Sequence, residues 1–121
     1  MEVNTLYAFK NLKGETMQTA SIEVNKEGKE ITVKKPMIFR EIITNLLNTE
    51  NQSSLLTPEK KAKAWVIMKR LWDGETAELS VDERALIIER ARIFYPTMTY
   101  GIIKDFLEAE QPKTAIDNKK E

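Results

Sequence analysis

Apolar and polar residues alternate in the first third of the chain. The segments 21–24 and 30–34 both alternate, which is typical of strands with one buried face. Between them lies 25–29, Asn-Lys-Glu-Gly-Lys, a polar segment of hairpin-loop length. The apolar segment 6–9 precedes another turn signal. We therefore predict a two- or three-stranded antiparallel meander over residues 1–36. We also expect helices to cover one of its faces, because an isolated hairpin is marginal in water.

Residues 37–108 have the apolar spacing of helices. Pro36 suits the start of the first helix. The apolar residues that follow recur at i, i+3, i+4 and i+7, which predicts one broad buried stripe. These residues are Ile38, Phe39, Ile42, Ile43, Leu46 and Leu47.

The second helix is predicted from its two ends. Thr57 can cap it, and Pro58 fits the first helical position. Gly74 follows the last apolar residue, where a left-handed glycine would end the helix.

The third helix is predicted to begin with a capping box and to end before a proline. Ser80 and Glu83 have the Ser-x-x-Glu spacing in which each side chain bonds a free backbone amide. Pro96 ends the apolar pattern of this helix. A short last helix follows, with Thr97 or Thr99 as its cap.

These elements predict an α+β fold that is mostly helical. An N-terminal antiparallel β-hairpin or meander (1–36) is expected to pack on a bundle of about four helices (37–108). Residues 1–108 are predicted to form a single domain, since a chain of 121 residues suffices for one. The apolar pattern ends at Glu108, so 109–121 is predicted to be a disordered tail.

Composition argues against most catalytic sites. The chain contains no Cys and no His, which removes the commonest nucleophiles, general bases and zinc ligands. Four glycines are too few for a glycine-rich phosphate loop. The candidate carboxylates for acid–base or metal chemistry have structural explanations near helix ends. They are Asp73, Glu75, Glu78, Asp82 and Glu83. We therefore predict a protein that is not an enzyme and holds no metal or cofactor.

The second helix carries the strongest candidate binding residues. Tryptophans and cations on one helix can stack on a base and neutralise its phosphate, or anchor a protein partner. The opposing interpretation is a core stripe, because Trp65, Met68 and Trp72 are spaced by three and four residues. The candidates from this helix are Lys61, Trp65, Lys69, Arg70 and Trp72.

Tyr95 and Tyr100 complete the candidate site. They flank the break at Pro96, where they can anchor a partner or close the end of the core. The last helix is a poor match to a DNA-reading helix, because Asp105, Glu108 and Glu110 outnumber Lys104 and acids repel phosphates.

From about residue 30 to 108, the order of features resembles small proteins encoded by bacteriophages or prophages. The resemblance rests on four segments: 39–47 (Phe-Arg-Glu-Ile-Ile-Thr-Asn-Leu-Leu), 57–60 (Thr-Pro-Glu-Lys), 79–83 (Leu-Ser-Val-Asp-Glu) and 95–107, which opens Tyr-Pro-Thr-Met-Thr-Tyr-Gly. It implies a phage accessory role, in assembly or in blocking a host component such as a defence enzyme, and it carries no catalytic residues.

The leading hypothesis is a non-enzymatic protein that binds a protein partner. The 19 basic and 19 acidic residues cancel, which permits homo-oligomers and argues against a general nucleic-acid binder. The first alternative is an oligomer that sequesters an anionic nucleotide, and the second is a DNA-binding regulator. The N-terminal residues lack the pattern of a signal peptide, and no apolar run is long enough to cross a membrane. We therefore expect a cytoplasmic protein, in the host cytoplasm if a phage encodes it.

Overall fold

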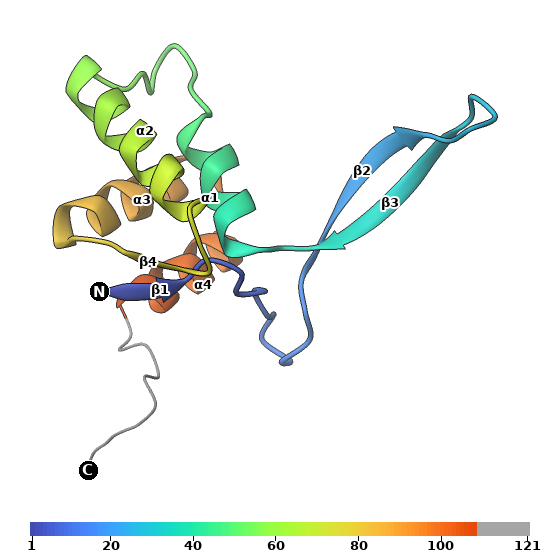
Figure 1. The fold of residues 1–121 in the computed structure, drawn as a ribbon, viewed down its shortest axis with the longest axis horizontal. Helices are drawn as coiled ribbons and strands as arrows, with labels where there is room; N and C mark the ends of the chain where they lie inside the picture. The colour runs from blue at the N-terminus through green and yellow to red at the C-terminus, as the bar shows by residue number, and fades with distance from the viewer. Residues whose placement is uncertain (109–121) are drawn as a thin grey trace.

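The computed structural model describes residues 1–108, and the predicted tail, 109–121, lies outside them. Four helices form a body from which one long hairpin extends (Figure 1). The predicted α+β class is confirmed. The elements in chain order are β1 (Glu2–Asn4), β2 (Gln18–Val24), β3 (Glu30–Pro36), α1 (Phe39–Leu47), α2 (Pro58–Leu71), β4 (Thr76–Glu78), α3 (Val81–Phe94) and α4 (Thr97–Glu108).

The core lies between the helices and includes the stripe predicted for the first of them. Helix α1 packs against both α2 and α3, and α3 packs against α4. Pro36 ends β3 and does not begin a helix, since α1 starts at Phe39. Ile38, the first residue of the predicted stripe, is only partly buried and precedes the helix. The buried residues of α1 are Phe39, Ile42, Ile43, Leu46 and Leu47.

The predicted starts of the second and third helices are confirmed. The Thr57 hydroxyl accepts a hydrogen bond from Lys60 N at 3.2 Å, directly before Pro58. Ser80 and Glu83 form the reciprocal capping box, with N–O distances of 3.1 and 2.8 Å. Tyr95 is extended, as the residue before a proline favours. Helix α4 begins directly after Pro96, so Thr97 and Thr99 lie inside its first turn and the prediction that one of them caps it is wrong.

The predicted left-handed cap at Gly74 is wrong. Helix α2 ends at Leu71, and the described glycines with positive φ are Gly14 and Gly28. The Gly74 carbonyl instead accepts a 2.6 Å hydrogen bond from the buried Thr5 hydroxyl. Gly74 therefore belongs to the contact between the N-terminal segment and the α2–α3 connection.

Strands β1 and β4 form a small antiparallel sheet that the sequence pattern did not predict. Val3 pairs with Ala77 at its centre, and both side chains are buried. The sheet joins the N-terminal segment to the connection between α2 and α3, where β4 also packs against α2.

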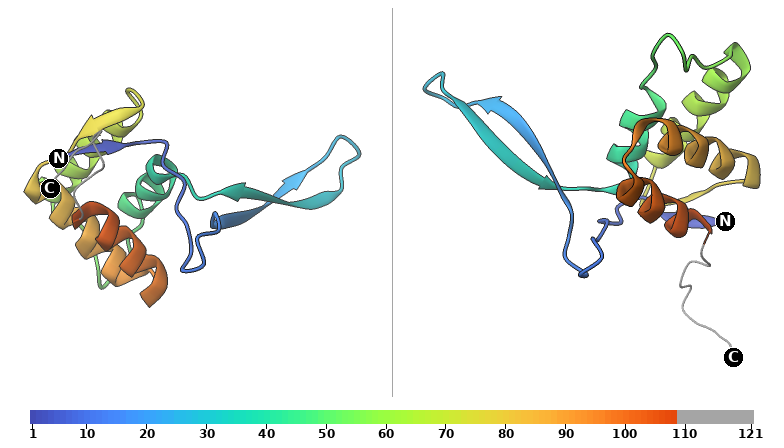
Figure 2. Two further views of the ribbon diagram at one scale, coloured as in Figure 1. Left: turned by 90° about the horizontal axis from the view of Figure 1, so that it is seen from below. Right: turned by 180° about the vertical axis from the view of Figure 1, so that it is seen from behind.

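The second sheet is an arm, formed by β2, β3 and the turn between them. Figures 1 and 2 show it extending away from the helices in every view. The predicted hairpin is confirmed, with Gln18 paired to Pro36 at its base and Val24 to Glu30 near its tip. The expectation that helices cover one face of it is wrong, because all its strand residues are exposed except the partly buried Val33.

The tip of the arm repeats a turn found near its base. The Asn25 side chain accepts hydrogen bonds from Glu27 N and Lys29 N, and Gly28 has a φ of 79°. In the segment 11–15 the Asn side chain accepts the same two bonds and the Gly has a φ of 83°. Each Asn-x-x-Gly segment reverses the chain at a left-handed glycine, which has no Cβ to strain.

The base of the arm is joined to the helices by an aromatic cluster. Tyr7 stacks on Phe106 of α4 at 4.7 Å between ring centroids, and Phe9 and Phe39 also contact Phe106. Phe9 N donates to Met37 O, and Met37 N donates to Met17 O. Both ends of the arm are therefore attached to the helices by packed aromatic rings and backbone hydrogen bonds.

Candidate functional site

One face of α2 collects four of the sequence-predicted site residues. Lys61, Trp65, Lys69 and Trp72 are separated by four, four and three residues, a spacing that places them on one side of a helix. All four are exposed. The opposite side of the helix is buried in the core and carries Ala64, Ile67 and Leu71.

The two tryptophans lie outside the core. Trp65 is 58% exposed and Trp72 is 48% exposed, so the core-stripe interpretation of these residues is wrong. Met68 is partly buried and packs against the core. Helix α2 has two sets of apolar residues at helical spacing. The set with the smaller side chains, Ala64, Ile67 and Leu71, faces the core.

Neighbouring side chains hold both indole rings. Trp72 Nε1 donates a 2.7 Å hydrogen bond to Thr44 Oγ1 of α1. The Arg40 guanidinium lies over the Trp72 ring at 4.3 Å from its centroid, and Lys69 Nζ lies 5.5 Å from the Trp65 ring. We call this set the α2 surface, which consists of Arg40, Thr44, Lys61, Trp65, Lys69 and Trp72.

The α2 surface has an excess of positive charge. Lys61 pairs with Glu50 at 3.6 Å, and beside the surface Lys60 pairs with Glu89 at 3.4 Å. Within residues 1–108, neither Arg40 nor Lys69 has a carboxylate partner. Their charges are instead directed toward the faces of the two indole rings.

The Glu50 carboxylate next to Lys61 is fixed by the chain itself. A backbone hydrogen bond from Leu56 N is the main cause that lowers the pKa of Glu50; burial opposes it, and the Lys61 ammonium lowers the pKa further. The carboxylate therefore stays ionised and holds the start of α2 against the preceding loop.

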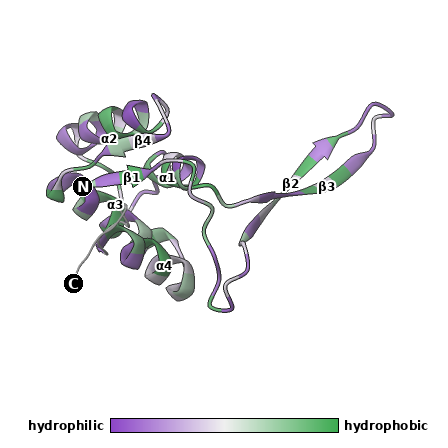
Figure 3. Cartoon of the chain, turned by 60° about the horizontal axis from the view of Figure 1, so that its bottom comes forward, coloured by the Kyte–Doolittle hydropathy of each residue, from purple (hydrophilic) through white to green (hydrophobic). Residues whose placement is uncertain are grey.

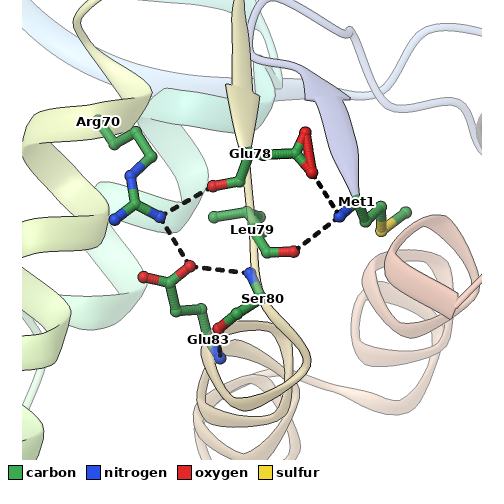
Figure 4. A pocket seen from close by; sticks show the side chains of 6 residues that line it. All are labelled: Met1, Arg70, Glu78, Leu79, Ser80 and Glu83. Carbon is green, nitrogen blue, oxygen red and sulfur yellow. Dashed lines mark hydrogen bonds and ion pairs between the residues drawn. The ribbon is translucent and has the colours of Figure 1, made fainter.

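Arg70 lies apart from the α2 surface and joins α2 to α3. Its Nη1 donates to Glu78 O at 2.8 Å and to Glu83 Oε1 at 2.7 Å. These groups line a shallow hollow of about 440 Å³ together with Met1, Leu79 and Ser80. Figure 4 shows how the six residues lie around it. Burial raises the pKa of Glu83, but the hydrogen bonds from Ser80 N and from Arg70 outweigh it and hold the pKa below its ordinary value. The guanidinium is thus committed to a structural ion pair.

Tyr95 and Tyr100 pack against the core, as the second interpretation of them predicts. The Tyr95 hydroxyl donates to Ile42 O at 3.4 Å, which ties the end of α3 to α1. Burial raises the pKa of the Tyr95 hydroxyl above its ordinary value of 10.0.

Two of the candidate carboxylates lie at the start of α3, where acidic residues favour the helix end. Glu83 belongs to the capping box, and Asp82 lies beside it in the first turn of α3. Over residues 1–108 no three Asp or Glu side chains gather as metal ligands would. In α4, Lys104 pairs with Glu108 at 2.6 Å, so the one basic residue of this helix, already a poor match to a DNA-reading helix, is neutralised.

Sequence reasoning missed the contributions of α1 to the α2 surface. Arg40 and Thr44 are four residues apart and lie between the buried positions of a strongly apolar stripe. No local signal pairs them with a tryptophan 28 or more residues later; only the packing of α1 on α2 brings them together.

Comparisons with known proteins do not extend this description. No protein-family model, curated protein or solved structure matches the chain. Over residues 1–108, no helix is long and apolar enough to cross a membrane.

Proposed function

We propose that this chain is a non-enzymatic binding protein that contacts an acidic protein partner through the α2 surface. The observation that carries the proposal is the pair of exposed tryptophans, each with a cation near the face of its ring. Trp65 and Trp72 are the two tryptophans of the chain, and both lie on this one helix face.

Exposed, ordered tryptophans favour a protein interface. Tryptophan and arginine are enriched among the few residues that supply most of the binding energy. The Thr44 hydroxyl and the Arg40 guanidinium hold Trp72 before any partner arrives, which lowers the entropy cost of binding. The partner is acidic because Arg40 and Lys69 present charges that no carboxylate of residues 1–108 neutralises.

The spacing of the rings separates a protein partner from a nucleotide. Trp65 and Trp72 are seven residues apart, about 10 Å along the helix axis. A single base can stack on one of them only, whereas a protein surface can cover both. The nucleotide and DNA alternatives are therefore secondary, and the phage accessory role and cytoplasmic location stay predictions.

Affinity capture with matched variants tests the proposal. The test variant is Trp65→Ala with Trp72→Ala, and the control is Leu12→Ala, which truncates an exposed apolar side chain in the turn at 11–15. A partner retained by wild type and control but lost by the double variant supports the proposal. Capture that all three proteins share in full would refute it.

The captured partner is then purified and titrated. Each tryptophan substitution is expected to weaken binding by about 30-fold, the size of one strong interface residue. Lys69→Glu is expected to weaken binding as well, and its charge-matched control Lys13→Glu is not. Mononucleotides and duplex DNA, titrated into the wild type while tryptophan fluorescence is recorded, serve as competing ligands. If a mononucleotide or duplex DNA binds saturably and no protein partner is captured, the α2 surface is a site for that ligand and the proposed protein partner is refuted.

A further inference from the structure

The arm carries apolar residues that the rest of residues 1–108 does not cover. Ile22 is 70% exposed and Val24 is 68% exposed, and Ile31 is exposed on the opposite face. Figure 3 shows apolar positions along both strands of the arm. A two-stranded hairpin standing in water is marginal, so the arm is expected to gain a further contact.

The hydrogen bonds at the two ends of the arm show which backbone groups point outward. Met37 N donates to Met17 O at the base, and Asn25 N donates to Lys29 O at the tip, each at 2.9 Å. Antiparallel pairs alternate between those that exchange backbone bonds and those that do not. With the observed register, the even-numbered residues of β2 therefore direct their N–H and C=O groups away from β3. They are Gln18, Ala20, Ile22 and Val24.

The two edges of the arm differ in their capacity to pair. The β3 edge carries Lys34, Lys35 and Pro36, which are residues that block strand addition. The β2 edge, Gln-Thr-Ala-Ser-Ile-Glu-Val, has no proline and one charge. That charge, Glu23, is neutralised by Lys35 at 3.2 Å. The open edge is thus β2.

We propose that β2 pairs antiparallel with β2 of a second copy of this chain, around a two-fold axis at Ser21. Only even residues have outward backbone groups, so even residues must face even residues across the axis. The register that uses the whole strand places Gln18 opposite Val24 of the second copy, and Ala20 opposite its Ile22. The two arms then form one four-stranded sheet in the order β3-β2-β2-β3.

A second copy fits this edge because an isologous contact presents the same strand from both sides, so that residue i faces residue j and j faces i. The one charge of β2, Glu23, is paired with Lys35 and faces Thr19 of the second copy, so no like charges meet across the axis. The outward positions bring the apolar residues Ala20, Ile22 and Val24 of both copies together on one face. The whole chain has a net charge of zero, so the two copies do not repel each other.

A cysteine at the axis tests the register directly, because the chain contains no cysteine of its own. The two Ser21 residues form a pair without backbone bonds, about 4.5 Å between Cα atoms, within reach of a disulfide. The two Thr19 residues lie about 13 Å apart. Under mild oxidation Ser21→Cys is expected to give covalent dimers, and the control Thr19→Cys is not. Equal cross-linking of both variants would overturn the register.

Proline substitutions test the edge. Ala20→Pro removes an outward N–H of β2, and Thr32→Pro removes an outward N–H of β3, while neither touches a bond within the arm. In sedimentation equilibrium on the full chain, Ala20→Pro is expected to raise the dimer dissociation constant by about tenfold or more, because the symmetric contact loses two backbone bonds. Thr32→Pro is expected to leave the dissociation constant unchanged and also controls for folding.

A wild-type monomer at all concentrations, or a dimer that resists Ala20→Pro, overturns the proposal. Neither result bears on the α2 surface, which the tryptophan variants test separately.

Discussion

Glu83 performs two tasks with one carboxylate oxygen, and removing it should weaken both. Its Oε1 accepts from Ser80 N in the capping box of α3 and from Arg70 Nη1 of α2. Glu83→Ala therefore loses the Glu83 half of the capping box and the ion pair that joins α2 to α3, while the Ser80 hydroxyl can still cap the helix. The α2 surface depends on that junction, because Arg70 lies in the last turn of α2, between Trp65 in the helix and Trp72 directly after it.

The expected loss of stability follows from the two contacts. A capping interaction contributes about 1 kcal/mol. A hydrogen bond to a charged group contributes about 1.5–3 kcal/mol when it is buried. The Arg70 side chain is 37% exposed and Glu83 12% exposed, so water screens the pair and about 1 kcal/mol is expected of it. Glu83→Ala should thus lower the free energy of unfolding by about 2 kcal/mol.

Glu83→Gln separates the two tasks. Glutamine can still accept from Ser80 N, so the cap is retained, but the charge is lost. We expect this variant to lower the free energy of unfolding by about 1 kcal/mol, near half of the alanine effect. Urea unfolding at neutral pH, followed by circular dichroism, measures both values.

The difference between wild type and Glu83→Gln should also depend on pH. Because the pKa of Glu83 is lowered in the folded protein, the carboxylate contributes stability above its ordinary pKa of 4.5. That contribution is lost as the pH falls through the lower, folded-state pKa. The wild-type advantage should therefore be constant near neutrality and disappear in acid. An advantage that persists unchanged in acid, or an alanine variant as stable as the glutamine variant, would refute the assigned roles.

Three other predictions test separate parts of the structure. Trp65 and Trp72 should both be quenched readily, and the iodide anion should quench them more than caesium because cations lie beside both rings; emission shielded from both ions would contradict their exposure. Gly28→Ala should strain the arm tip by about 1–2 kcal/mol, because Gly28 has a positive φ. Hydrogen exchange should then increase in the arm while the helices keep their protection, and a uniform increase would show that the arm is not independent. In a spectrophotometric titration, Tyr95 should ionise above pH 10, since burial raises its pKa. Tyr95→Phe should remove that step, and the stabilising effect of the neutral hydroxyl should be lost as the pH rises above the ordinary value.

The features that could be predicted from the sequence are those decided by neighbouring residues. Thr57 with Pro58, and Ser80 with Glu83, are complete within four residues, and their caps form as predicted. The turn at Asn25 and Gly28 is equally local. Strand β1 could not be found in this way, since it has three residues and its partner β4 lies more than 70 residues away.

The spacing of apolar residues could not identify the buried face of α2, because two sets of residues have the same helical spacing. Trp65, Met68 and Trp72 form one, and Ala64, Ile67 and Leu71 form the other. Periodicity gives the spacing of side chains and does not give the volume that is available between α1 and α3. The smaller residues of α2 pack in that space. Lys61, Trp65, Lys69 and Trp72 lie on one side of α2, whereas Arg70 lies apart from them. The exposure of the tryptophans, and the part played by Arg40, required the folded chain.

The meeting of Met17 and Met37 at the base of the arm has a consequence for how this protein can change. Their 2.9 Å backbone bond closes the arm at its origin, so the residues between them form an insertion that leaves and re-enters the body at one point. An insertion of this kind can be shortened, lengthened or exchanged without altering the helical core. Selection can therefore change the length and the sequence of the arm while the fold that carries it stays the same.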